Sequence, residues 1–500
     1  MDTMETKDMT DVTDITNITD TPEISESKED AEKEKPKKEN KEQTDKKEKK
    51  RKKSKKAADP DAPFLPKKPF KTHGGVRVNH MKNTAEIPSE ALPVPKRVVI
   101  SMQQHIGTAC EPIVKKGDSV TVGQKIGDSD SPLCAPIHAS VSGQVTAIGT
   151  MLMPNGTEVK TVEIASDGQQ TLCPDIQPPV VTNADELYAA VRESGLVGLG
   201  GAGFPVSVKI NYSPDKSVDT LVVNGAECEP YLTADYREMR ESPKDVIEGA
   251  RLLREMLGLS RAIIGIEANK PDAVKELASL LKERSLDDTM CVLKLKTAYP
   301  QGAEKVLIKA CTDRAVPVGK IPADAGCIVL NITSVGFIAR YLKTGIPLVA
   351  KRITVDGSAI AEAKNVVAPI GTIVSDIADF CGGFDKPPQK VLMGGPMMGT
   401  ALYSLDYPII KQNNGLIFMG EAETDALRPT DCIRCGRCVS ACPMLLTPVN
   451  IQHLVQKRDI DGLNDLCVTS CMECGCCAYS CPAHRPLVQF LRMAKNLVKS

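Results

Sequence analysis

The stretches that decide the fold of the C-terminal part are CIRCGRCVSACP, residues 432–443, and CMECGCCAYSCP, residues 471–482. Both follow the pattern C-x-x-C-x-x-C-x-x-x-C-P. Three thiolates with two residues between neighbours can hold one [4Fe-4S] cluster, and the fourth cysteine then points towards a second cluster. The pattern therefore predicts two clusters, each with three ligands from one motif and one from the other. The predicted ligands are Cys432, Cys435, Cys438 and Cys481 for one cluster, and Cys471, Cys474, Cys477 and Cys442 for the other.

Zinc is the alternative metal, because its sites also use C-x-x-C pairs and four thiolates. A zinc site does not need a repeated three-plus-one pattern followed by proline, so the cluster interpretation is favoured. Ten of the eighteen cysteines lie between Cys432 and Cys481, which in a long chain indicates metal binding rather than disulfides. Cys467 and Cys476 lie outside the pattern, and we expect them to be small buried residues or bystanders.

Short helices are predicted around the two motifs. Residues 448–466 have apolar side chains at helical spacing, and the helix is expected to break at Gly462. Residues 486–498 show the same helical spacing of apolar side chains. The two motifs should therefore pack between helices, as in a two-cluster ferredoxin. A cluster pair transfers single electrons, so another part of the chain must supply or receive them.

Length, composition and charge limit the remaining possibilities. A chain of 500 residues with 41% hydrophobic residues predicts about three folded domains. The formal net charge of −1 gives no electrostatic reason to expect nucleic acid as a partner. Residues 1–62 are poor in large apolar side chains, and nine of the eleven residues from Lys46 to Lys56 are Lys or Arg. We expect this segment to be a disordered tail; the alternative is an electrostatic tether to anionic lipid or an acidic partner.

Membrane insertion and secretion are not expected from the sequence. It contains no run of about 18 apolar residues that would span a bilayer. Residues 1–20 are rich in Thr and Asp and lack the basic and apolar stretches of a secretory signal. The default expectation is therefore the cytoplasm.

A glycine-rich stretch, VGLGGAGFPVSVK, occupies residues 197–209. Glycines at 198, 200, 201 and 203 would let backbone N–H groups approach a phosphate or a flat ring without a Cβ in the way. Alone this pattern is weak, because such a loop can also be a simple turn.

Two further stretches strengthen the interpretation of the glycine-rich stretch as a ligand-binding loop. An apolar strand at residues 220–223 is followed by NGAECEP, residues 224–230, and a strand at 291–296 is followed by YPQGAEK, residues 299–305. A helix is predicted at 304–311 and a further strand at 328–331. Strands and helices thus alternate along the chain, so residues from about 180 to 345 should form an α/β domain. Polar side chains just past strand ends lie where α/β sheets bind ligands; the alternative is a solvated loop.

The motifs GxGGAGFP, NxxExEP and YPQGxEK resemble, in that order, the FMN- and NADH-binding region of the flavoprotein subunit of respiratory complex I. Together with the RxVPxGxxPADxG pattern at residues 314–326 and the double cysteine motif, the chain is more similar to the RnfC family, the NADH-site subunit of the Rnf ion-translocating electron-transport complex. One position departs from complex I, which has a glutamate where this chain has Ala303.

The resemblance implies roles for residues of the α/β domain. The glycine-rich loop would line FMN, with Phe204 and Lys209 near the nucleotide, and Glu227 and Glu304 would lie where NAD(H) and FMN exchange hydride. Further contacts to the ribityl chain, nicotinamide and flavin would come from nearby loops. The implied cofactor-binding residues are Gly198, Gly200, Gly201, Gly203, Phe204, Lys209, Asn224, Glu229, Tyr299 and Gly302.

Two β-rich modules complete the expected organisation. Residues 96–149 resemble a barrel-sandwich hybrid of the biotinyl/lipoyl kind, but the stretch 128–135 has no lysine for a prosthetic group, which indicates a structural or docking module. His105 and His138 have no ligand-type partners at metal spacing, so we expect structural histidines. Residues 346–390 resemble a β-grasp (SLBB-like) module, and Gly394–Gly399 is predicted to be a tight turn.

The predicted fold class is multidomain α/β. It combines a barrel-sandwich module, a Rossmann-like FMN domain, a β-grasp module and a helical two-[4Fe-4S] ferredoxin-like domain. The expected boundaries are 1–62 for the tail, 63–170 for the barrel-sandwich module, 171–345 for the FMN/NADH domain, 346–400 for the β-grasp module and 401–500 for the cluster domain.

The chemistry of the cofactors suggests the function. A nicotinamide exchanges two electrons as hydride and a cluster exchanges one, so FMN between them is required. The resemblance implies a peripheral subunit on the cytoplasmic face of the inner membrane, attached through other Rnf subunits that translocate ions and connect NAD(H) to ferredoxin. One alternative is a soluble flavin/iron-sulfur reductase such as a cobalamin reductase, which begins close to the GxGGAGFP motif. Another is a non-enzymatic interaction scaffold.

Overall fold

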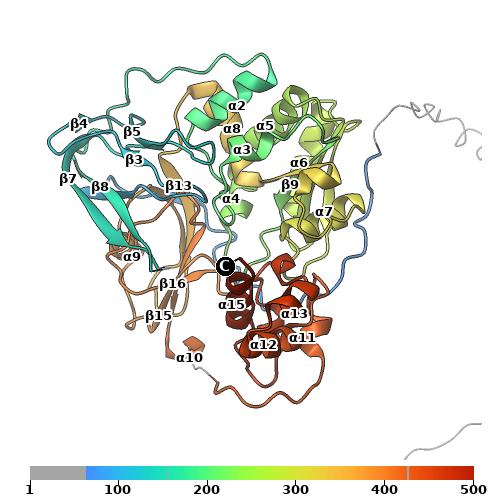
Figure 1. The fold of residues 1–500 in the computed structure, drawn as a ribbon. Helices are drawn as coiled ribbons and strands as arrows, with labels where there is room; N and C mark the ends of the chain where they lie inside the picture. The colour runs from blue at the N-terminus through green and yellow to red at the C-terminus, as the bar shows by residue number, and fades with distance from the viewer. Residues whose placement is uncertain (1–63, 155, 425–426, 500) are drawn as a thin grey trace, which may run out of the picture. The chain divides into compact units, whose positions relative to one another are not determined.

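The computed structural model describes residues 64–154, 156–424 and 427–499, all within one compact unit (Figure 1). The tail predicted at residues 1–62 lies outside the described residues. Among the helices of the described part, none combines the length and the apolar character needed to cross a bilayer.

A parallel four-stranded sheet in the order β11-β10-β9-β12 forms the centre of the α/β part. Alternate residues of β9 enter opposite cores, with Leu221 and Val223 on one face and Val222 on the other. This alternation follows from the pleat, and burial of both faces explains the nearly continuous apolar strands. The strands predicted at 220–223, 291–296 and 328–331 are confirmed. The bounds are β9 (Thr220–Gly225), β10 (Arg261–Glu267), β11 (Met290–Leu295) and β12 (Cys327–Asn331).

Helices cover both faces of this sheet. Side chains from α5, α6 and α8 share one core with β9, β10 and β12, while α7 packs in the core on the other face. The chain runs from β9 outwards to β10 and β11 and then returns to place β12 on the other side of β9. A ligand crevice is expected at such a reversal of strand order, at the carboxyl ends of the strands. The helices of this part are α2 (Ala184–Glu193), α3 (Val206–Ile210), α4 (Ala234–Glu241), α5 (Pro243–Met256), α6 (Pro271–Glu283), α7 (Glu304–Thr312), the 3-10 helix η1 (Pro322–Ala325) and α8 (Ile332–Thr344).

Two antiparallel sheets, β2-β8-β7-β4 and β3-β5-β6, enclose a separate apolar core. Their side chains alternate between this core and solvent, as in β2, where Val98 and Ile100 are fully buried. The strands are β2 (Arg97–Ser101), β3 (Glu111–Pro112), β4 (Ser119–Val120), β5 (Lys125–Asp128), β6 (Ile137–His138), β7 (Gly143–Leu152) and β8 (Glu158–Ser166).

A mixed six-stranded sheet has the order β1-β14-β13-β17-β15-β16. Its core includes helix α9 and the buried face of β13 and β17. The sheet continues past residue 400, because β17 pairs with both β13 and β15. The elements are β1 (Ser89–Ala91), β13 (Ala350–Asp356), β14 (Lys364–Pro369), α9 (Val374–Phe380), β15 (Lys390–Met393), β16 (Thr400–Leu402) and β17 (Gly415–Met419).

The C-terminal part is helical and surrounds the two cysteine motifs (Figure 1). The predicted helix break at Gly462 is wrong. The chain turns at Arg458, which adopts a left-handed conformation, and the Asp459 side chain then caps the next helix by accepting from the Gly462 backbone N–H. The elements are α10 (Glu421–Thr424), α11 (Arg437–Ser440), α12 (Pro448–Lys457), α13 (Ile460–Asp465), the 3-10 helix η2 (Val468–Ser470), α14 (Cys476–Tyr479) and α15 (Leu487–Lys499).

The segment before β1 contacts the α/β part. The Phe70 backbone N–H donates to the Ala310 carbonyl of α7, and further along the segment Lys82 reaches the loop after β9. This segment therefore lies along the α/β part before the chain enters the mixed sheet at β1.

Candidate functional site

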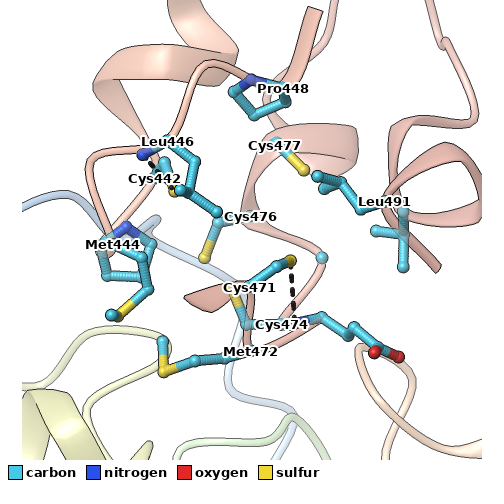
Figure 2. A pocket seen from close by; sticks show the side chains of 14 residues that line it. Cys442, Met444, Leu446, Pro448, Cys471, Met472, Cys474, Cys476, Cys477 and Leu491 are labelled. Carbon is cyan, nitrogen blue, oxygen red and sulfur yellow. Dashed lines mark hydrogen bonds between the residues drawn. The ribbon is translucent and has the colours of Figure 1, made fainter. Parts of the chain in front are cut away.

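Four cysteines predicted to share one cluster line a single hollow in the helical part (Figure 2). Backbone N–H groups donate to two of the sulfurs, from Leu446 to Cys442 Sγ at 3.4 Å and from Glu473 to Cys471 Sγ at 3.3 Å. Thiols that converge on one space and accept N–H bonds form a donor set that fits an iron-sulfur cluster. The four residues are Cys442, Cys471, Cys474 and Cys477.

The cysteines of the other predicted set are more exposed. Cys435 is exposed, whereas Cys474 and Cys477 of the second motif are buried. The Cys481 thiol lies close enough to Cys438 to interact with it electrostatically, and the Arg434 N–H donates to Cys432 Sγ at 3.4 Å. Cys481 of the second motif is thus within electrostatic range of a cysteine of the first motif.

A glycine in each motif makes the turn that starts a helix. Gly436 and Gly475 have φ angles of 72° and 81° and are the N-caps of α11 and α14. A side chain at these angles would strain the backbone. The glycine after the second cysteine therefore sets the direction of the short helix that contains the third cysteine and precedes the fourth.

The glycine-rich loop lies at the carboxyl end of β12. Gly198 N donates to Phe204 O at 2.9 Å, which closes the loop, and a Cβ on Gly200 would lie 2.4 Å from Asn331 Nδ2. Gly201 is exposed and has open space where a Cβ would be. The loop thus occupies the reversal point of the sheet and presents bare backbone to solvent.

Asn224, near the end of β9, meets Gly302 from the loop after β11. The Asn224 amide donates to the Gly302 carbonyl at 2.8 Å, and the Gly302 N–H donates to Cys228 Sγ at 3.3 Å. Cys228 is buried, and burial raises the pKa of its thiol to about 12. This thiol therefore stays protonated and neutral at pH 7.

Lys209 and Glu304 form an ion pair of 2.5 Å between α3 and α7. Glu304 is the first residue of α7, where a carboxylate is favoured by the helix dipole. Both side chains are about one-third exposed, so the pair remains accessible from solvent.

Glu227 has a clear structural contact. Its carboxylate accepts the backbone N–H groups of Asp235 at 2.7 Å and Tyr236 at 3.1 Å, in the first turn of α4. Burial raises the pKa of Glu227 to about 7, although the nearby Lys82 ammonium acts in the opposite direction. The carboxylate therefore holds the loop after β9 to the start of α4.

Glu229 contacts the predicted turn at Gly394–Gly399. One carboxylate oxygen accepts the Met397 N–H at 3.0 Å, and a Cβ on Gly395 would lie 2.4 Å from it. The other oxygen, Oε1, is buried without a hydrogen-bond partner among the described residues. Burial raises the pKa of Glu229 to about 7 because the backbone N–H bonds and Lys82 only partly offset the loss of water.

Tyr299 joins the α/β part to the cysteine motifs. Its ring is 1% exposed, and its hydroxyl donates to the Cys474 carbonyl at 2.7 Å. Its backbone exchanges hydrogen bonds with Val76, and the Gly75 N–H donates to the Ala441 carbonyl at 2.9 Å. Burial strongly raises the pKa of Tyr299, so the hydroxyl keeps its proton. Residues 75–76 therefore lie between the loop after β11 and the first motif.

Cys476, which was expected to be buried, is fully buried at this joint. Its thiol donates to the Tyr299 carbonyl at 3.8 Å, within the range for sulfur. Cys476 also lines the hollow of Cys442, Cys471, Cys474 and Cys477, although it is outside the predicted ligand set (Figure 2).

Three lysines whose ammonium groups donate to carbonyls of these loops were not found from the sequence. Lys82 Nζ donates to the carbonyls of Glu227 at 2.9 Å and Glu229 at 2.8 Å. Lys351 Nζ donates to Leu199 O at 3.0 Å, inside the glycine-rich stretch. Burial lowers the pKa of Lys82 and Lys351 to about 8.

The third lysine, Lys411, donates to the carbonyls of Gly195 at 2.7 Å and Pro136 at 2.6 Å, and burial lowers its pKa to about 8 as well. Each of the three lysines fixes a loop that is distant in sequence, so no local pattern could have indicated them.

Buried polar atoms without partners also gather near the loops. Gln301 Nε2 and Gln412 Oε1 have no hydrogen-bond partner among the described residues, and Gln412 lies against Gly203. Leaving buried polar atoms unpaired costs about 1–3 kcal/mol each, so such atoms indicate a missing partner. With Glu229 Oε1 they offer donors and acceptors to a polar ligand such as a flavin nucleotide.

The expectation that His105 lacks ligand-type partners is wrong. The structure brings its ring close to Cys110 and Cys134, all three buried. Cys134 lies in the loop between β5 and β6, and its approach to His105 depends on the sandwich fold. No spacing pattern in the sequence could have shown it.

Comparison with known protein families gives three matches along the chain. Residues 70–169 match the RnfC barrel sandwich hybrid domain, residues 191–340 match the Nuo51 FMN-binding domain, and residues 425–482 match a 4Fe-4S dicluster domain. The chain therefore contains the barrel-sandwich, FMN-binding and dicluster domains that the sequence motifs predicted.

Individual relatives match over most of their length. The chain is 43% identical to a subunit of the Na(+)-translocating ferredoxin:NAD(+) oxidoreductase complex of Acetobacterium woodii, over 84% of this chain and 96% of that protein. It is 42% identical to a subunit of the proton-translocating ferredoxin:NAD(+) oxidoreductase complex of Clostridium ljungdahlii, over 77% and 84% of the two chains. It is 40% identical to a subunit of the ion-translocating oxidoreductase complex of Rhodobacter capsulatus, over 86% and 84%. At these identities and coverages, the chain belongs to the RnfC family, whose members are subunits of ion-translocating oxidoreductase complexes.

Proposed function

We propose that this chain is the electron-transfer subunit of an Rnf-type ferredoxin:NAD oxidoreductase, with NAD(H) and FMN in its α/β part and two [4Fe-4S] clusters in its helical part. The observation that carries the proposal is the joint at Tyr299, which connects the predicted flavin loops to the second cysteine motif through one 2.7 Å hydrogen bond. When bound, FMN supplies the conversion between hydride and single-electron transfer.

The glycine-rich loop and the loops after β9 and β11 would hold the flavin. Bare backbone at Gly198, Gly200, Gly201 and Gly203 suits the close approach of a flat ring or a phosphate, and Phe204 closes the loop. The unpaired Gln301, Gln412 and Glu229 atoms would supply polar contacts to the flavin. We assign Asn224, Tyr299 and Gly302 to the same site, where they shape the wall between β9 and the cluster region.

Glu304 and Lys209 would contact the nicotinamide nucleotide. Their ion pair is partly exposed and lies at the start of α7, so it can exchange partners with an incoming ligand at small cost. Glu227 is proposed to act differently. Its carboxylate holds α4 through two backbone N–H groups and keeps the loop with Glu229 in place, so it positions the hydride-exchange region.

The contacts support an order for the two clusters. The set formed by Cys442, Cys471, Cys474 and Cys477 touches Tyr299 and therefore lies next to the flavin loops. The set formed by Cys432, Cys435, Cys438 and Cys481 includes the exposed Cys435, so it is the set that can meet a partner protein. Electrons would then pass between the α/β part and a partner protein through the buried set and the exposed set in series.

The sheet orders support the finer domain assignments. A parallel sheet with a reversal between β9 and β12 is the arrangement of a Rossmann-like domain. The mixed sheet supports a β-grasp module, since two neighbouring strands precede α9 and the last strand, β17, lies in the centre beside β13. We place the end of this module after Met419 and the start of the cluster domain after it.

The remaining subunits of an Rnf-type complex are the proposed partners. They would attach this chain to the cytoplasmic face of the membrane, translocate ions and connect it to ferredoxin. The ferredoxin:NAD+ oxidoreductase subunits from Acetobacterium woodii and Clostridium ljungdahlii support this assignment.

The test is anaerobic rapid mixing of the reconstituted full chain with NADH, followed by flavin absorbance and then cluster absorbance. Flavin bleaching should precede cluster reduction. Glu304→Ala should slow flavin bleaching by about tenfold or more, as expected for a lost positioning contact, with unchanged iron content. The exposed Glu283→Ala, at the end of α6, is the matched control and should behave as wild type. Absence of flavin reduction by NADH in the wild-type chain would overturn the nicotinamide assignment.

A further inference from the structure

The two-sheet sandwich contains a group of three side chains that the proposed electron transfer does not use. His105 and Cys110 come from the segment between β2 and β3, and Cys134 comes from the segment between β5 and β6. His105 is 4% exposed and each cysteine is 1% exposed. The loop that contains Cys134 is the one without the lysine of biotinyl/lipoyl carrier domains.

The distances between the three side chains are those of a metal site. Cys110 Sγ lies 3.4 Å from Cys134 Sγ and 3.8 Å from His105 Nε2, and ligand atoms of all three residues lie within 4.8 Å of one another. Tetrahedral zinc with Zn–S of about 2.3 Å and Zn–N of about 2.0 Å requires S···S of about 3.8 Å and S···N of about 3.5 Å. The sulfurs are also well beyond the roughly 2.05 Å of a disulfide.

The hydrogen bonding of the histidine ring agrees with a metal site. His105 Nδ1 is buried without a partner, and the other ring nitrogen faces thiols only, within the described part of the chain. A metal–nitrogen bond at Nε2 would replace the weak contacts of this nitrogen with the thiols.

We propose that His105, Cys110 and Cys134 bind one thiophilic divalent cation, Zn²⁺, as a site separate from the iron-sulfur clusters. Two thiolates and Zn²⁺ carry no net charge together, so their burial costs less than burial of the thiolates alone. The remaining coordination position takes a water molecule, as in three-ligand protein sites.

The position of the site indicates what the metal would stabilise. Next to His105, the Ile106 N–H donates to the Gly203 carbonyl at 3.1 Å, at the end of the glycine-rich loop. Gln104 accepts the Lys411 backbone N–H at 2.9 Å. A metal that ties this segment to the loop of Cys134 would therefore hold the sandwich against the glycine-rich loop.

The test uses the full chain with its clusters reconstituted anaerobically, so that the motif cysteines are occupied by iron. After Zn²⁺ addition and desalting, about one zinc per chain should remain in addition to the cluster iron. Cys110→Ser and Cys134→Ser should each lower the retained zinc at least tenfold and leave the iron unchanged. Cys173→Ser, at a partly buried cysteine outside both sites, is the matched control and should retain zinc.

Cobalt gives a second, spectroscopic measurement that does not depend on the two cysteine variants. Co²⁺ added to the wild-type chain should produce the visible absorption of a tetrahedral thiolate site, and His105→Gln should shift it. Zinc retained by both cysteine variants, or absence of any retained metal in the wild type, would overturn the proposal. A Cys110–Cys134 disulfide found by mass spectrometry in the anaerobically prepared protein would overturn it too. Zinc and iron contents are read without NADH, so failure here is distinguishable from failure of the proposed function.

Discussion

The cluster region and the α/β region present ligands in opposite ways. All predicted cluster ligands lie within residues 432–481, in loops and two short helices, beside a small core around α12, α13 and α15. The flavin loops are held by contacts across the chain, such as Lys351 to Leu199 and Lys411 to Gly195, which are 152 and 216 residues apart. They also rest on a large core shared by the sheet and α5, α6 and α8. We therefore expect the fold of the first region to depend on its metal and the fold of the second on its packing.

Loss of one cluster ligand tests this dependence and has the largest expected effect. Cys474→Ser should remove the cluster next to Tyr299, so that iron falls from about eight to about four atoms per chain. Iron and acid-labile sulfide analysis after anaerobic reconstitution measures this change.

The control for that experiment is Cys467→Ser, because Cys467 lies outside the pattern and is partly buried. It should retain all the iron. Full iron content in Cys474→Ser would contradict the ligand assignment, and loss of the α/β fold in the same variant would contradict the independence of the two regions.

The second prediction breaks the α/β region through its core. Ile264 in β10 is fully buried against the helices, so Ile264→Ala should lower the free energy of unfolding by about 2–5 kcal/mol. Denaturant unfolding followed by far-ultraviolet circular dichroism measures the loss, while the iron content should stay unchanged. Val180→Ala, at a side chain that is 83% exposed, should change the stability by less than about 0.5 kcal/mol.

The sequence was most informative where chemistry is local. The crossed ligand sets are a prediction from the spacing of eight cysteines alone, and the structure places Cys442 in the hollow of the second motif. Strands β9, β11 and β12 could be predicted from short apolar runs, because both faces of a parallel sheet are buried.

The sequence was uninformative where contacts are distant. Nothing near Lys82 or Lys351 indicates that the side chain is buried against a loop about 150 residues away. The approach of Cys134 to His105 depends on how two sheets stack. The hydrophobic periodicity of the sequence cannot predict that stacking. The break between α12 and α13 was misplaced because a left-handed Arg458 and the Asp459 cap end the helix before the glycine.

A third prediction concerns the buried carboxyl group between the two regions. The folded-state pKa of Glu229 is raised by burial to about 7 from 4.5, so the folded chain binds the proton more tightly than the unfolded chain. Its stabilising contribution is therefore present below about pH 4.5 and is lost as the pH rises towards 7. Glu229→Gln should flatten the fall in stability over this window, as measured by thermal unfolding at a series of pH values. The exposed Glu283→Gln should leave the pH profile parallel to wild type, and an unchanged profile in Glu229→Gln would show that the group is ionised in the folded chain.

The smallest expected effect comes from the single hydrogen bond between the two regions. Tyr299→Phe removes only the hydroxyl that donates to the Cys474 carbonyl, so the free energy of unfolding should fall by about 0.5–1.5 kcal/mol, plus the cost of a carbonyl left without that donor. Tyr479→Phe is the matched control, because the Tyr479 hydroxyl makes a longer bond of 3.4 Å on an exposed ring. If the Tyr299 bond also holds the buried cluster in place, amide hydrogen exchange around Cys474 should accelerate in Tyr299→Phe and not in Tyr479→Phe. Equal exchange in the two variants would mean that the cluster alone orders the loop around Cys474. The boundary between the metal-dependent region and the packing-dependent region would then lie at Tyr299.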